Sequence, residues 1–242
     1  MTSTPLVACE PASVRWRGGS SSPVRPLVVP WPWIALLLVG FPLLMTARSA
    51  AWRAIGPEGL PGLGYYVPFW LTVIVLQALS TVLVLRAMRA SGSDLAGLGL
   101  RVGARRASIT IALIVGLGIV LIAYRELTPA PTSVAAADPF ASPTTLSDRC
   151  VWLVEALMAA FCEELLYRGF AITALAGRGL PLLLAVLIAV VPWLLNHGLT
   201  GLERAPFYVI TGLLLGALYA WRRSLYPNMV LHTLLALMTL LG

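Results

Sequence analysis

The chain has 242 residues, of which 59% are hydrophobic and only 11% are charged. Since a soluble domain carries about 25% charged residues, this composition excludes an ordinary soluble globular protein and predicts an all-α integral membrane protein. The formal net charge of +7 comes from arginines that lie between apolar runs, which indicates orientation in a lipid bilayer and not binding to nucleic acid.

The first part of the chain is predicted to be a disordered tail followed by three transmembrane helices. Residues 1–25 are rich in Ser, Pro and Arg and show no periodicity, which is typical of a disordered segment. Residues 26–147 hold uncharged runs, each near the ~20 residues that a spanning helix needs, at Pro26–Ala47, Gly59–Leu85 and Ala107–Tyr124. A loop rich in Pro, Ala and Thr follows from Arg125 to Arg149.

Residues 148–242 are predicted to form four more membrane helices, which gives a bundle of about seven. We expect these helices at Asp148–Ala176, Gly179–Leu202, Ala205–Trp221 and Ser224–Gly242. Ser147 or Asp148 is the predicted N-cap of the first of them, and Gly177 its predicted end. Four charged residues interrupt this first helix: Glu155, Glu163, Glu164 and Arg168.

The distribution of arginine predicts the orientation. Arginines gather in the tail and in the loops after the second, fourth and sixth predicted helices. By the positive-inside rule the N-terminus is cytoplasmic, and seven spans place the C-terminus outside. We therefore expect a multi-pass protein of the cell membrane.

The sequence FCEELLYRGF at Phe161–Phe170 places three charges in an apolar setting. Glu164 and Arg168 are four residues apart, so they lie on one helix face in the favourable order for an ion pair. Glu163 is turned by ~100° from Glu164. This pattern predicts that arginine neutralises Glu164 and leaves Glu163 available for other work.

The only two histidines, His197 and His232, also fall in predicted membrane helices. Trp193 lies four residues before the first, and Asn228 four residues before the second. Two imidazoles and a carboxylate can activate water, or can hold a divalent metal such as zinc. Because no HExxH motif is present, zinc is not the first suggestion of the sequence, and the cofactor stays open.

These residues together resemble the CPBP family, the intramembrane CAAX prenyl endopeptidases and bacteriocin-processing (Abi) enzymes. EELLYR at Glu163–Arg168 is similar to its EExxxR motif, WLLNH at Trp193–His197 to its FxxxH motif, and His232 to its last histidine. The resemblance covers about residues 148–242, which would be the catalytic helices. It implies cleavage of a membrane-associated protein or peptide near its C-terminus or anchor.

The resemblance also implies roles for the residues. Glu163 would be the general base, His197 would help to hold the water, and His232 with an amide neighbour would act on the oxyanion. A zinc ion, if present, would be bound by Glu163, His197 and His232. Glu164 and Arg168 would support the site.

One position departs from the family pattern. The family carries Asn or Asp four residues after the final histidine, where this chain has Ala236. Asn228 lies four residues before His232, on the same helix face, and is the candidate replacement. The alternatives are an impaired family member that acts as an immunity or scaffold protein, and a proton-coupled transporter that uses the Glu/His cluster.

Glu163, His197 and His232 can form one site only if they lie at the same depth in the membrane. At ~1.5 Å per residue, Glu163 and His197 lie ~21 and ~27 Å from the turn at Gly177–Gly179, and His232 lies ~10 Å from the turn at Arg223–Tyr226. They meet only if the Gly177–Gly179 turn protrudes beyond the bilayer or the helices tilt strongly.

Overall fold

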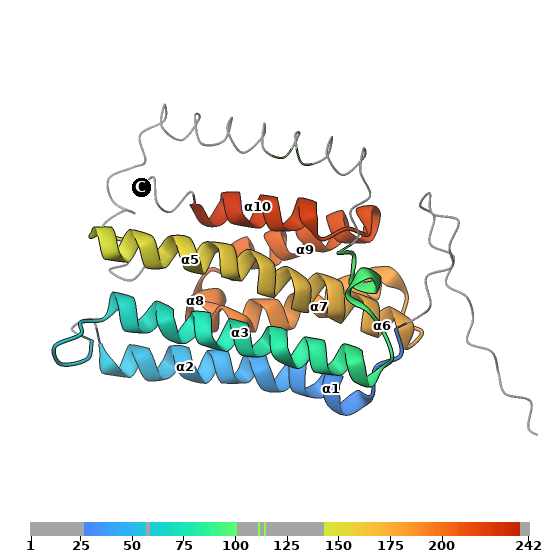
Figure 1. Cartoon of the computed structure of the whole chain (residues 1–242), viewed down its shortest axis with the longest axis horizontal. Helices are drawn as coiled ribbons and strands as arrows, with labels where there is room; N and C mark the ends of the chain where they lie inside the picture. The colour runs from blue at the N-terminus through green and yellow to red at the C-terminus, as the bar shows by residue number, and fades with distance from the viewer. Residues whose placement is uncertain (1–26, 57–58, 101–110, 112–113, 115–142, 238–242) are drawn as a thin grey trace, which may run out of the picture.

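A computed structural model describes residues 27–56, 59–100, 111, 114 and 143–237. Within these ranges every regular element is helical, and the only β-type pairing is an isolated bridge between Leu60 and Gly64. The all-α prediction is thus confirmed for the described residues (Figure 1). The predicted tail 1–25 and most of the predicted third helix, Ala107–Tyr124, lie outside them.

The two N-terminal rods are the helices best suited to cross a membrane. The first consists of α1 (Trp31–Ala35), a π-helical stretch η1 (Leu36–Gly40) and α2 (Phe41–Ile55), and the second is α3 (Tyr66–Ala90). Both are long and apolar enough to span a bilayer by length and composition. Each extends past its predicted end to include arginines, because the apolar run marks only the part of a helix that suits the hydrocarbon core.

The helix that carries the two glutamates is one continuous rod with a π-helical middle. It comprises α5 (Leu146–Glu163), η3 (Glu164–Ile172) and α6 (Thr173–Gly177). Its N-cap is Thr145, which accepts from the Asp148 amide while the Asp148 carboxylate accepts from the Thr145 amide. The prediction of Ser147 or Asp148 as N-cap was therefore wrong, since Asp148 occupies the third helical position of a capping box.

The predicted helix Gly179–Leu202 is divided in two at His197. The chain forms α7 (Leu182–Asn196) and α8 (Gly198–Glu203), because Gly198 has a φ of +62° and so turns the backbone out of the helix. Two further helices follow, α9 (Ala205–Arg222) and α10 (Tyr226–Leu237). A short 3₁₀ turn, η2 (Leu95–Leu98), precedes the α5 rod in the chain.

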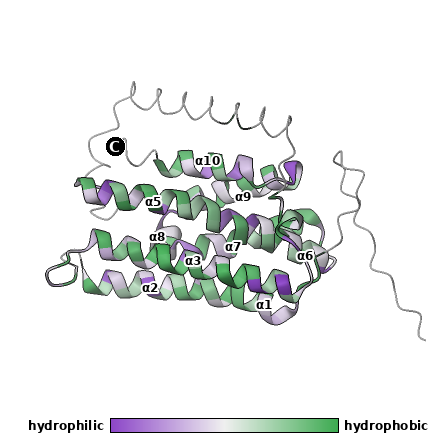
Figure 2. Ribbon diagram, viewed as in Figure 1, coloured by the Kyte–Doolittle hydropathy of each residue, from purple (hydrophilic) through white to green (hydrophobic). Residues whose placement is uncertain are grey.

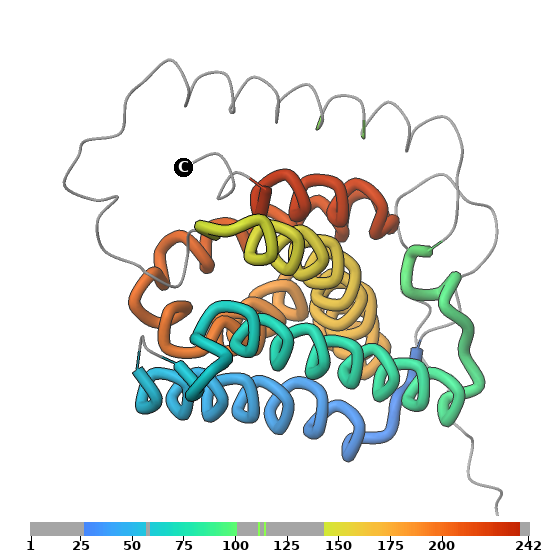
Figure 3. The backbone as a smooth tube through the Cα atoms, turned by 60° about the vertical axis from the view of Figure 1, so that its left-hand side comes forward, coloured from blue at the N-terminus to red at the C-terminus, as the bar shows by residue number. Residues whose placement is uncertain are grey.

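The π-helical stretch η3 lies at the centre of the bundle. All nine of its residues are buried, and η3 packs against α3, α7, α9 and η2. Figure 3 shows the α5 rod between the pair α2 and α3 on one side and α10 on the other. Outward positions of α2, α3 and α7 are mainly hydrophobic (Figure 2), for example Leu43, Val75 and Leu183. The charged motif is thereby placed in the interior.

Candidate active site

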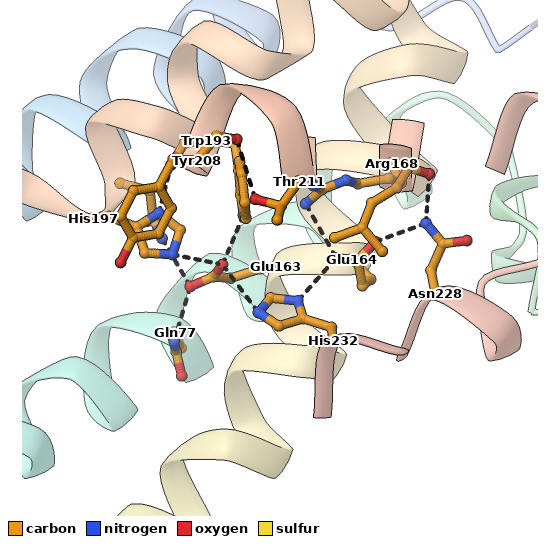
Figure 4. Close-up of polar contacts among 12 residues, drawn as sticks. Gln77, Glu163, Glu164, Arg168, Trp193, His197, Tyr208, Thr211, Asn228 and His232 are labelled. Atoms are coloured by element: carbon orange, nitrogen blue, oxygen red, sulfur yellow. Dashed lines mark hydrogen bonds and ion pairs between the residues drawn. The ribbon is translucent and has the colours of Figure 1, made fainter. Parts of the chain in front are cut away.

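Glu163 lies at the centre of the site and is held by three N–H donors, of which Figure 4 labels Trp193 and Gln77. The indole Nε1 of Trp193 donates to Oε2 at 2.9 Å, and the amide Nδ2 of Asn196 donates to Oε1 at 2.9 Å. Gln77 on α3 adds a longer bond to Oε1 at 3.3 Å. Three donors from two other helices stabilise the charge of this buried carboxylate and fix its orientation.

His197 presents an unprotonated nitrogen to Glu163 in its neutral form. Its Nδ1 lies 2.8 Å from the carbonyl oxygen of Trp193, and a carbonyl can only accept, so Nδ1 carries the hydrogen. Nε2 then has its lone pair free and lies 3.6 Å from Glu163 Oε2. The ring packs against Tyr208 at a centroid distance of 4.1 Å. This arrangement can hold a water molecule between the imidazole and the carboxylate.

His232 joins the two glutamates. Its Nδ1 lies 2.9 Å from Glu164 Oε1, and its Nε2 lies 4.0 Å from Glu163 Oε2. Because Nδ1 donates to the Glu164 carboxylate, Nε2 faces Glu163. The neighbouring carboxylate also stabilises a positive charge on the ring. His232 can therefore donate a hydrogen bond from Nε2 when it carries a second proton.

Glu164 and Arg168 form the predicted ion pair in the interior. Arg168 Nη1 lies 3.1 Å from Glu164 Oε1, and the two side chains are 3% and 0% exposed. The contact is electrostatic, since neither Nη1 nor Nη2 makes a hydrogen bond of good geometry to a described residue. The guanidinium also lies over the Trp193 ring, 4.4 Å from its centroid. Arg168 thus supports both Glu164 and the indole that holds Glu163.

Asn228 contacts Glu164. Its Nδ2 donates to Glu164 Oε2 at 3.1 Å and to the carbonyl of Leu215 at 2.7 Å. Both hydrogens of the amide are used by these two bonds. The structure therefore places Asn228 where it orients Glu164, and through Glu164 the ring of His232.

The two glutamates differ in access. The side chain of Glu164 is fully buried, whereas those of His197 and His232 are 19% and 11% exposed and that of Glu163 is 6% exposed. A substrate that reaches the histidines can meet Glu163 but not Glu164. Of the two carboxylates, Glu163 is thus the one on the accessible side of the site.

The residue types Glu163, His197 and His232 match a zinc site with two histidines and one glutamate. Ligand atoms around zinc lie about 3.3 Å apart at bonds of about 2.05 Å, whereas two acceptors bridged by one water lie up to about 4.6 Å apart. The observed 3.6 and 4.0 Å fall between these values, and no group of three His, Cys, Asp or Glu side chains is assembled as a metal site in the described ranges. The donor types match zinc, and Glu163, His197 and His232 would hold the ion when one is bound, where it would polarise the attacking water. The steps proposed below use the side chains alone.

The structure brings together all six predicted site residues, including the three whose depths posed a condition. Sequence reasoning missed Gln77 and Asn196, and it treated Glu155 only as an interruption of the helix. Gln77 Nε2 lies 3.4 Å from Glu155 Oε1, so one amide links Glu155 to Glu163. The available signal was an isolated amide in the apolar run Gly59–Leu85 and the asparagine directly before His197.

Comparison with known proteins finds a family for the part of the chain that carries the site. Residues 145–238 match the sequence model of the family described as type II CAAX prenyl endopeptidase Rce1-like. No curated protein and no solved structure matches the chain significantly. The matched segment begins at Thr145, the N-cap of α5, and contains both glutamates and both histidines of the site but not Gln77. Residues 145–238 are therefore similar to the CPBP family of CAAX proteases, and the match supports that family for this segment.

Proposed function

We propose that the protein is an intramembrane endopeptidase that cleaves a membrane-associated protein or peptide near its C-terminus or anchor. The observation that carries the proposal is the convergence of Glu163 Oε2 with the Nε2 atoms of His197 and His232, at 3.6 and 4.0 Å. Two imidazole nitrogens and one carboxylate oxygen face the same small region, and each is fixed from behind by another bond.

In the proposed mechanism Glu163 is the general base. A water held between Glu163 Oε2 and His197 Nε2 loses a proton to Glu163 while its oxygen attacks the scissile carbonyl carbon. Glu163 later gives this proton to the nitrogen of the leaving amine as the carbon–nitrogen bond breaks. The bonds from Trp193 and Asn196 keep the carboxylate in place through both transfers.

His232 is proposed to stabilise the oxyanion of the tetrahedral intermediate. When the ring is protonated, its Nε2, which lies 4.0 Å from Glu163 Oε2, can donate to the oxyanion, and Glu164 compensates the charge that the ring then carries. Such a preorganised donor is worth about 10²–10³ in rate. Asn228 and Arg168 contribute indirectly, because they hold Glu164.

We also propose that the protein is a multi-pass protein of the cell membrane with a cytoplasmic N-terminus. The outward apolar faces of the two long rods support insertion, and the arginine distribution supports the orientation. A reporter fused after Gly242 is expected to be active outside the cytoplasm, and one inserted at Gly103 inside it. The opposite pattern contradicts the proposed orientation.

Glu163→Gln tests the proposed chemistry. Glutamine keeps the size and polarity of the side chain but cannot accept the proton. We expect cleavage of a prenylated CAAX-type peptide by purified protein in lipid nanodiscs to fall by about 10²–10⁴. The melting temperature should fall only slightly, because the new amide nitrogen cannot accept from the N–H donor that faces it. Glu203→Gln, which removes an exposed carboxylate on α8, is the matched control and should cleave at the parental rate. Near-parental cleavage by Glu163→Gln refutes the mechanism.

A further inference from the structure

The break between α7 and α8 leaves backbone polar groups next to His197. The last carbonyls of a helix and its first amides have no partner within the helix, and in an apolar setting each unpaired group costs free energy. Leu195 lies at the end of α7 and Leu199 in the first turn of α8. His197 sits between them and provides no side-chain cap for α8. The His197 amide contacts the carbonyls of Leu194 and Leu195, and the remaining partners come from another element.

Helix α2 supplies these partners through two hydroxyls. Thr46 Oγ1 donates to the carbonyl of Leu195 at 2.8 Å, and Ser49 Oγ accepts from the amide of Leu199 at 3.3 Å. Thr46 also lies 3.0 Å from the carbonyl of Pro42 in its own helix. Since a hydroxyl has one hydrogen, the shorter contact to Leu195 is the better bond.

The close approach of α2 depends on the glycine at the break. A Cβ atom at Gly198 would lie 2.3 Å from Ser49 Cβ and 2.5 Å from Ser49 Oγ. The φ of +62° at Gly198 independently disfavours a side chain there. Backbone and side-chain contacts therefore place α2 directly against the residues on both sides of His197.

We propose that Thr46 and Ser49 are positioning residues for His197. They hold the backbone before and after the histidine, and so direct Nε2 toward Glu163 at 3.6 Å. Neither residue lies in the segment 145–238 that matches the family. The effect on turnover rests on the proposed peptidase function, whereas the effect on the break does not.

Hydrogen exchange tests the effect on the break without any substrate. In lipid nanodiscs, Ser49→Ala is expected to speed exchange of the Leu199 amide by about fivefold, which is the loss of one ordinary hydrogen bond. Thr46→Val is expected to speed exchange in the same segment. Ser91→Ala is the matched control, because it removes a hydroxyl bonded to a carbonyl of its own helix, that of Ala87. The proposal is overturned if the segment around Leu199 exchanges as slowly in Ser49→Ala and Thr46→Val as it does in Ser91→Ala.

Kinetics test the effect on the histidine. Thr46→Val is expected to lower kcat by about 10- to 100-fold, which is the range for a small misplacement of a catalytic group. KM should stay near the parental value. Thr46→Ser keeps the hydroxyl and should restore most of kcat. Failure of this rescue assigns the loss to packing and overturns the hydrogen-bond argument. A parent protein without cleavage activity instead contradicts the proposed function, and the exchange result then decides the inference alone.

Discussion

The buried ion pair makes a quantitative prediction for Arg168→Met. Methionine approximates the length of the arginine stem but carries no charge, so Glu164 remains ionised and fully buried without its cation. His232 Nδ1 at 2.9 Å and Asn228 Nδ2 at 3.1 Å still donate to Glu164. The contact of the guanidinium with the Trp193 ring is lost as well.

The magnitude follows from these contacts. Removal of one partner of a buried pair costs about 3–5 kcal/mol. Because two donors remain on Glu164, and because the Arg168 contact lacks hydrogen-bond geometry, we expect the lower end, about 3 kcal/mol. For a chain of this size that corresponds to a fall in melting temperature of about 6–12 °C.

Thermal unfolding in detergent, followed by circular dichroism, measures this fall. The double variant Glu164→Gln with Arg168→Met removes both charges and should recover a large part of the loss, as expected when a buried charge is no longer unpaired. Arg53→Ala, which breaks an exposed pair with Glu203, is the control and should melt near the parent. A single variant as stable as the parent, or a double variant less stable than the single, refutes the reasoning.

Three more predictions follow from the site. If glutamate alone activates the water, a chelator should leave turnover unchanged. A loss of turnover that added zinc restores instead assigns Glu163, His197 and His232 as zinc ligands. Asn228→Ala should lower turnover. If an amide beside His232 is required, adding Ala236→Asn to this variant should recover part of the turnover. Parental turnover by Asn228→Ala contradicts both its role in orienting Glu164 and its role as the replacement amide. Gly212→Ala would place a Cβ 2.8 Å from Trp193 Cε3, so stability should fall by about 1–3 kcal/mol and turnover should fall with it. Gly40→Ala, whose Cβ meets nothing closer than 3.5 Å, should do neither.

Sequence reasoning predicted the contacts that depend on spacing within one helix. The Glu164–Arg168 pair follows from a separation of four residues, and it forms even though η3 is π-helical there. The two histidines were singled out because ionisable groups in apolar helices are expensive and functional. Both reach Glu163 in the structure.

Contacts between helices could not be predicted in the same way. Gln77 was missed because an apolar span has no strong polar face to show which neighbour it packs against, so the rotation of α3 is decided by tertiary packing. The division of the helix at His197 was missed because a glycine is tolerated inside a helix, and only the φ of Gly198 reveals the break. The number of spans stays a prediction, since two rods meet the length and composition of a span among the described residues.

The origin of the donors around Glu163 bears on how this chain can evolve. Gln77 lies outside the segment shared with the family, yet its amide bonds a carboxylate inside that segment and a second one at Glu155. A substitution at 77 alone leaves two acids facing each other without their common donor. We therefore expect correlated substitutions between positions 77 and 155 among related sequences. A chimera that joins residues 145–242 to foreign upstream helices should lose turnover unless those helices restore the amide of Gln77 and the hydroxyls of Thr46 and Ser49.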